Sequence, residues 1–117
     1  MAETERDFRV PIGNSWSARF TVVDDDDDPV NLTGATTRCL LKSDPDSADS
    51  VATATIAVSY VNASVGQVRI SLTYTQTAAL SEGQYWFDFL VRTSEGKEGT
   101  PLGGAIYAYT PITRALT

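Results

Sequence analysis

Residues 66–91, GQVRISLTYTQTAALSEGQYWFDFLV, decide the fold together with residues 29–42, PVNLTGATTRCLLK. Apolar side chains alternate with polar ones at both ends of the longer stretch, which is typical of half-buried strands. Leu80, Gly83 and Tyr85 lie between these ends with the spacing of a tyrosine corner, a turn that crosses between two sheets. Each stretch therefore reads as strand, turn, strand, and the pair predicts an antiparallel β-sandwich.

Other parts of the chain alternate in the same way, with polar or glycine-containing turns between them. The expected strands are residues 6–11, 16–23, 35–42, 51–61, 68–72, 85–91 and 104–110. Residues 75–80 do not alternate and predict a single helical turn, with Thr75 or Thr77 as its cap. We therefore expect an all-β, Ig-like antiparallel sandwich of about seven strands, with an N-terminal arm and first short strand at residues 1–12 and a single domain at residues 13–117.

The alternation also predicts which side chains fill the core between the sheets. The expected core residues are Phe20, Val22, Cys39, Ile56, Val58, Val68, Ile70, Leu72, Tyr85, Phe87 and Phe89. A chain of 117 residues with 42% hydrophobic side chains is large enough to bury such a core without disulfides or metal.

The net charge of −6 argues against nucleic acid and anionic membrane as partners, because such binding needs clustered lysine and arginine. An acidic surface suits docking on a basic patch of another protein. The chain has no histidine, and its single cysteine, Cys39, lies in an apolar run, so we expect a buried thiol and no enzyme activity. We expect no cofactor.

The aspartate run is the most conspicuous group of charges. Carboxylates at Asp24, Asp26 and Asp28 offer a candidate calcium site, because Ca²⁺ takes oxygen ligands, but the Gly and Glu of an EF-hand loop are missing. The favoured interpretation is a solvated hairpin tip without bound metal. Asp88 lies within an aromatic strand, and we expect it to form an ion pair with Arg38 or Arg69.

Several apolar residues fall on nominally outward faces or in the N-terminal arm, and contiguous exposed apolar surface often marks an interface. The candidate interface residues are Phe8, Val10, Leu40, Trp86 and Leu90. In this hypothesis the arm lies along an adjacent subunit through Phe8 and Val10. The alternative for Leu40, Trp86 and Leu90 is that a loop or the arm covers them.

The start of the chain, MAETERDFRVPIG, is charged where a signal peptide would be apolar, and no apolar run approaches the roughly 20 residues that cross a bilayer. We therefore expect synthesis in the cytoplasm of the producing cell.

The segments PVNLTG at residues 29–34 and TAAL with GQYWFD at residues 77–88 carry a resemblance that extends over residues 13–114. In them the chain resembles the Ig-like domains of tailed-bacteriophage virion proteins, in particular the N-terminal domain of baseplate upper proteins and related tail, fibre and decoration proteins. The resemblance implies a non-enzymatic structural protein of the virion, made in the host cytoplasm, that contacts other virion proteins and further copies of itself.

Within that resemblance we favour a capsid decoration subunit. A baseplate, tail or fibre-attachment adaptor is the alternative, because relatives in this family often continue into a fibre region. A carbohydrate-binding sandwich module is a second alternative, in which exposed aromatic side chains would stack on sugar rings.

Overall fold

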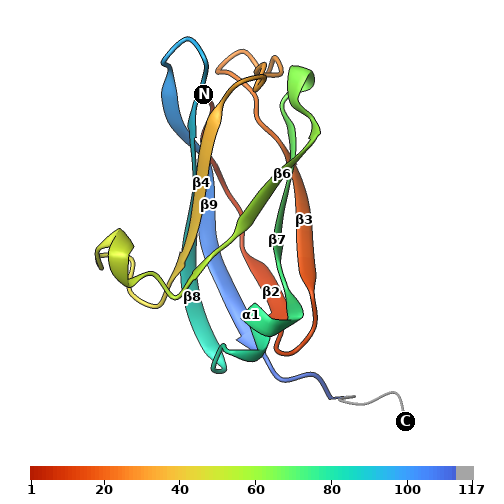
Figure 1. Cartoon of the computed structure of the whole chain (residues 1–117), viewed down its shortest axis with the longest axis vertical. Coiled ribbons are helices and arrows are strands. Elements are labelled where there is room, and N and C mark those ends of the chain that lie inside the picture. The colour runs from red at the N-terminus through yellow and green to blue at the C-terminus, as the bar shows by residue number, and fades with distance from the viewer. Residues whose placement is uncertain (113–117) are drawn as a thin grey trace.

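The computed structural model describes residues 1–112, in which nine strands form two facing β-sheets (Figure 1). The strands of the larger sheet are β1 (Thr4–Glu5), β2 (Phe8–Pro11), β4 (Thr36–Lys42), β5 (Ala54–Thr55), β8 (Gly83–Arg92) and β9 (Glu98–Tyr109). The strands of the smaller sheet are β3 (Trp16–Thr21), β6 (Ala57–Asn62) and β7 (Gln67–Leu72). The expected all-β, Ig-like sandwich is confirmed.

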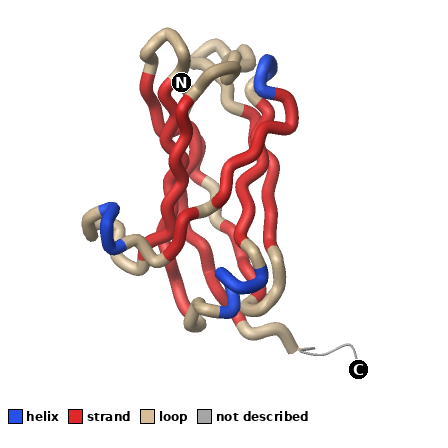
Figure 2. The backbone as a smooth tube through the Cα atoms, in the orientation of Figure 1, coloured by secondary structure: helices blue, strands red, loops and turns tan. Residues whose placement is uncertain are grey.

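The helical segments are short and lie at the ends and side of the sandwich (Figure 2). They are the 3₁₀ turns η1 (Asp49–Val51) and η2 (Ala63–Val65) and the helix α1 (Tyr74–Ala78). No helix in residues 1–112 is long and apolar enough to span a bilayer.

The order of strands explains how two sheets share one core. The larger sheet runs β1/β2, β9, β8, β4, β5, and the smaller one runs β3, β7, β6. Consecutive strands such as β3 and β4 therefore belong to opposite sheets, and the aspartate run connects them. It forms a tight turn of its own, closed by the bridge between Val23 and Pro29, rather than the tip of a β3–β4 hairpin.

All eleven predicted core residues belong to or pack against the buried cluster between the sheets. Eight are buried, whereas Phe20, Val58 and Tyr85 are partly buried at its margin. Burial raises the pKa of the Cys39 thiol to about 12, with the nearby Asp88 charge as a second cause, so Cys39 stays a protonated, inert thiol.

The tyrosine corner is present. The Tyr85 hydroxyl lies 3.0 Å from the backbone N–H of Ser81, which donates to it, and 3.3 Å from the Ser81 carbonyl. The helical turn before it starts earlier than predicted, because Thr73 is the cap and forms a capping box with Gln76. Thr77, one of the two expected caps, is instead fully buried and bonds the Asn14 carbonyl at 2.8 Å.

The N-terminal segment is not a free arm. β1 and β2 both pair in parallel with β9, from Thr4 opposite Leu102 to Pro11 opposite Tyr109. Val10 is completely buried, and the ring of Phe8 packs edge-on against Trp16. The side chain of Val10 therefore belongs to the core, and that of Phe8 is partly buried against it, so the contact of these two residues with an adjacent subunit stays a prediction.

Residues 51–61 are not one strand. The chain passes through η1, pairs with β4 at β5, and then crosses to the smaller sheet as β6. Alternation does not reveal this crossing, because inward-facing residues of both sheets meet the same core.

Candidate binding groove

The outer face of the larger sheet carries an unusual set of side chains. Alternation puts Leu40 on β4 and Trp86 on β8 on this face, away from the core. Leu40 is nevertheless only 7% exposed, and Trp86 is partly buried. Something outside the sheet must therefore cover them, as the loop-or-arm alternative proposed.

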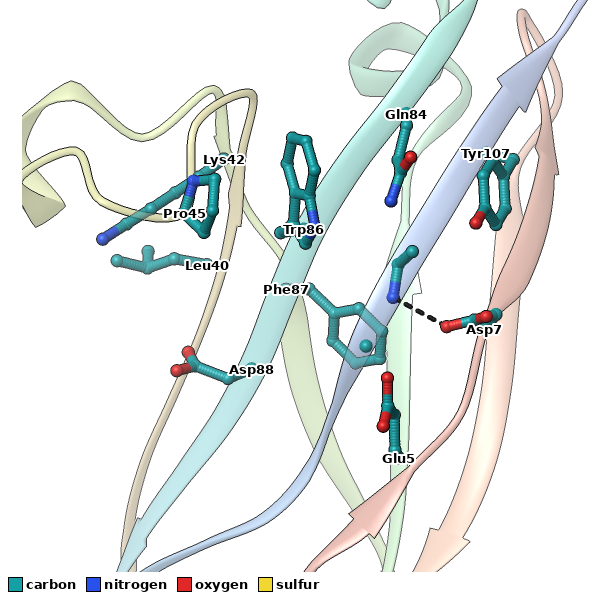
Figure 3. A pocket seen from close by; sticks show the side chains of 12 residues that line it. Glu5, Asp7, Leu40, Lys42, Pro45, Gln84, Trp86, Phe87, Asp88 and Tyr107 are labelled. Atoms are coloured by element: carbon teal, nitrogen blue, oxygen red, sulfur yellow. Dashed lines mark hydrogen bonds between the residues drawn. The ribbon is translucent and has the colours of Figure 1, made fainter.

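Two segments far apart in sequence flank this part of the face. On one side, residues 43–53 project from the sheet as a loop that contains η1 (Figure 1). On the other side, the N-terminal segment runs along β9. Between them lies a groove of about 350 Å³, which we call the outer groove (Figure 3). It is lined by Glu5, Asp7, Leu40, Lys42, Pro45, Gln84, Trp86, Phe87, Asp88, Gly104, Ala105 and Tyr107.

β9 carries small residues at and beside the floor of the outer groove. Ala105 lies opposite Trp86, and Gly103 lies opposite Asp88. A Cβ atom at Gly103 would meet the Phe87 carbonyl oxygen at 3.4 Å and Asp88 Cβ at 3.6 Å, which is close to ordinary contact. A small side chain at position 103 would therefore fit without steric conflict. The glycine found there leaves space above the sheet.

The N-terminal wall depends on the next residue, Gly104. Its φ is +155°, and a Cβ atom there would lie 2.1 Å from the Arg6 carbonyl oxygen. Only glycine allows the N-terminal segment to approach β9 this closely. At the same place the Asp7 carboxylate accepts a hydrogen bond from the Ala105 N–H at 3.0 Å, so a side chain completes the ladder between β1 and β2.

The opposite wall is held by ion pairs. Lys42 Nζ donates to the Ser47 carbonyl and to Asp49 Oδ1, each at 2.8 Å. Arg38 Nη1 reaches Asp49 Oδ2 at 3.2 Å. The hydrogen bond and charge of Lys42, with a further contribution from Arg38, lower the pKa of Asp49, which therefore stays ionised between the two cations.

The prediction that Asp88 forms an ion pair with Arg38 or Arg69 is wrong. Arg38 pairs with Asp49 instead, and Arg69 belongs to β7 in the other sheet. Within residues 1–112, the Asp88 carboxylate takes part in no hydrogen bond or ion pair. Desolvation is the main cause that raises its pKa, and the charge of Asp49 raises it further, against the opposing effect of Lys42.

The outer groove combines acidic side chains with a few apolar ones. Glu5, Asp7 and Asp88 contribute three carboxylates, whereas its single cation, Lys42, is already paired with Asp49. A ligand that brings an apolar group together with a positive charge fits this lining.

The structure brings together two of the five predicted interface residues, Leu40 and Trp86. Leu90, which is 45% exposed, lies further along the same face, opposite Arg38 and in a separate shallow hollow. Sequence reasoning missed Glu5, Asp7, Gln84 and Tyr107 as groove residues. The signal available was the run Gly103-Gly104-Ala105 inside an expected strand, because glycine there indicates close approach of another backbone.

The candidate calcium residues are arranged as a turn. Asp24 Oδ1 accepts hydrogen bonds from the N–H groups of Asp26 and Asp28, at 2.9 and 3.0 Å, and Asp27 has a φ of 63°. Over residues 1–112 no group of three or more carboxylate, cysteine or histidine side chains could hold a metal ion. The run is thus a hydrogen-bonded turn.

These features define a class, an Ig-like β-sandwich with an acidic, apolar-floored groove on its outer face. No protein-family model and no curated protein sequence matches the chain. Among solved structures it is similar to AggA, the major subunit of aggregative adherence fimbriae type I from Escherichia coli, with a TM-score of 0.37 and 13% identity over 88% of this chain and 89% of that one. A likeness of this size carries no argument about function.

Proposed function

We propose that the protein is a non-enzymatic structural subunit of a tailed-bacteriophage virion, most simply a capsid decoration subunit, and that it docks on another virion protein through the outer groove. The phage context rests on the resemblance of residues 13–114 to virion Ig-like domains. The docking role rests on the groove itself, where the apolar side chains of Leu40 and Trp86 lie among the carboxylates of Glu5, Asp7 and Asp88.

The expected occupant is a segment of the partner protein that presents an apolar side chain next to arginine or lysine. The apolar group would cover Trp86, and the cation would face Asp88, which has no partner of its own in the described chain. Desolvated charge pairs and buried aromatic side chains carry much of the binding energy in protein interfaces. A basic partner also matches the net charge of −6.

The baseplate, tail or fibre adaptor would use the same groove in a ring of few copies. The two locations differ in stoichiometry, because a shell offers many equivalent sites and a tail ring only a few. Quantitative mass spectrometry of purified particles decides between them: hundreds of copies per particle support decoration, and about a dozen or fewer support the adaptor, since ring symmetry limits the number of sites. Absence of the protein from particles would contradict the proposal in both forms.

One observation favours the carbohydrate-binding alternative. Trp86 and Tyr107 line the outer groove together with Gln84 and Asp88, and sugar sites combine aromatic faces with amide and carboxylate groups. A glycan array with the purified protein tests this reading directly. Specific glycan binding that is lost in Trp86→Ala and kept in Tyr74→Ala, an exposed aromatic residue outside the groove, would favour the sugar-binding module over virion docking.

A further inference from the structure

The free edge of β6 differs from the other edges of the two sheets. β1 and β2 carry charged side chains and end in Pro11, and β5 is only two residues long. On β3 the edge is partly covered, because Arg6 Nη1 donates to the Arg19 carbonyl at 3.4 Å. Charges, proline, short length and covering groups are the devices that keep sheet edges from pairing with other chains.

β6 lacks charge and proline, and its side-chain hydrogen bonds are those of Tyr60, whose hydroxyl donates to the Ala35 carbonyl at 3.2 Å, and of Asn62, which accepts from Ser64. Its sequence, Ala57–Asn62, contains no charged residue, no proline and no glycine. In the described part of the chain it pairs only with β7, and no other backbone hydrogen bond involves these six residues. Tyr60 and Val61 are 42% and 41% exposed. Such a segment has the composition of a strand that adds to another strand.

The hydrogen-bonding pattern shows which groups are open. The Val22 N–H, just after β3, donates to the Gly66 carbonyl, just before β7. Every second residue of β7 counted from Gly66 therefore directs its backbone groups toward β3, and the residues between them, including Arg69, direct theirs toward β6. Ser59 lies opposite Arg69. Because backbone groups alternate along a strand, the N–H and C=O groups of Val58 and Tyr60 point toward the open edge.

We propose that β6 pairs antiparallel with β6 of a second copy of this chain, about a twofold axis at Ser59. This register places Val58 of each copy opposite Tyr60 of the other, so the open backbone groups form hydrogen-bonded pairs. A β-branched residue opposite an aromatic one is a favourable cross-strand pair. Two copies with a charge of −6 each repel over most of their surface, and the uncharged β6 edge is where close approach costs least.

The bulge between Tyr60 and Asn62 lies at the end of β6 and leaves the four residues before it regular. The pairing uses only this regular part. It is independent of the outer groove, which lies on the larger sheet, and therefore of the proposed function.

Sedimentation equilibrium of the purified chain over a range of concentrations tests the pairing. The expected mass rises from 12.6 kDa to twice that value. Ser59→Glu places two like charges opposite each other at the axis, while within each copy the new carboxylate faces Arg69, so folding is preserved. This variant should weaken the dimer about tenfold or more. Ser17→Glu, an exposed position on the β3 edge, is the matched control and should not change the dimer.

An equimolar mixture of Ser59→Glu and Ser59→Lys should regain the dimer, because opposite charges then meet at the axis. In the wild type, amide hydrogen exchange at Val58 and Tyr60 should slow as the concentration rises, which gives a readout that needs no variant. A monomer at every concentration, or a dimer that Ser59→Glu leaves unchanged, would overturn the proposal.

Discussion

The carboxylate of Asp7 accepts a hydrogen bond from the backbone N–H of Ala105, at 3.0 Å and across 98 positions of sequence. Asp7 lies in the segment between β1 and β2. β1 and β2, on either side of Asp7, pair with β9 in the same register, since Thr4 faces Leu102 and Phe8 faces Ile106. The N-terminal wall of the outer groove is thus held on β9 by the pairing of β1 and β2, by the Arg6 N–H, which donates to the Gly103 carbonyl at 3.0 Å, and by the Asp7 side chain.

Asp7→Ala should lower the free energy of unfolding by about 1–2 kcal/mol, because the N–H of buried Ala105 loses its acceptor. Urea unfolding followed by tryptophan fluorescence measures the change. Asp7→Asn keeps an acceptor oxygen and should lose less, and Glu5→Ala, on the same wall, should change little. Equal stability of Asp7→Ala and the wild type would show that water replaces the carboxylate without cost.

Gly104→Ala should destabilise the fold by about 1–3 kcal/mol, because the new Cβ cannot coexist with the Arg6 carbonyl and the backbone conformation disfavours any side chain. Gly103→Ala is the matched control. The new Cβ atom at position 103 lies close to van der Waals distance from its neighbours, so the free energy of unfolding of this variant should stay within about 0.5 kcal/mol of the wild type. Differential scanning calorimetry of the two variants measures both effects, and an equal loss in both would contradict the close approach at position 104.

Asp88→Asn should raise stability at neutral pH and weaken binding to a basic partner. The pKa of Asp88 is raised in the folded chain, so the folded state binds a proton more tightly than the unfolded state does. Stability therefore falls as pH rises through the interval between the unfolded pKa and the raised folded one, and the loss persists above it. Asparagine at position 88 does not ionise, so the variant avoids this loss of stability.

Chemical unfolding of the wild type and Asp88→Asn from acidic to neutral pH measures the difference between their free energies of unfolding. The variant should be the more stable at neutral pH, and the difference should vanish below the unfolded pKa of an aspartate. A variant that is less stable than the wild type at neutral pH would mean that the carboxylate has a stabilising partner.

The sequence predicts those parts of the fold that local pattern controls. Alternation from Trp16 to Val22 and from Tyr85 to Val91 identifies strands and their inward faces correctly, because each inward position meets the same core. The tyrosine corner is also predictable, since its residues are close in sequence.

The sequence predicts two residues of the outer groove, as candidate interface residues, but not the groove itself. Leu40 and Trp86 stand out as apolar residues on an outward face, but their cover comes from segments whose position depends on long-range contacts. The parallel pairing of the N-terminal segment with β9 leaves no periodic signal. The fold of residues 43–53 depends on Asp49 bridging two cations of β4, which spacing alone does not specify.

A photo-crosslinking amino acid in place of Gln84, which is exposed at the outer groove, tests the central claim most directly when the variant is incorporated into virus particles. The account predicts a crosslink to one segment of another virion protein that carries arginine or lysine next to an apolar residue. The same probe in place of Tyr74, which is exposed outside the groove, should not reach that segment. Particles that incorporate the Gln84 variant at full occupancy and yield no crosslink from the groove would contradict the account.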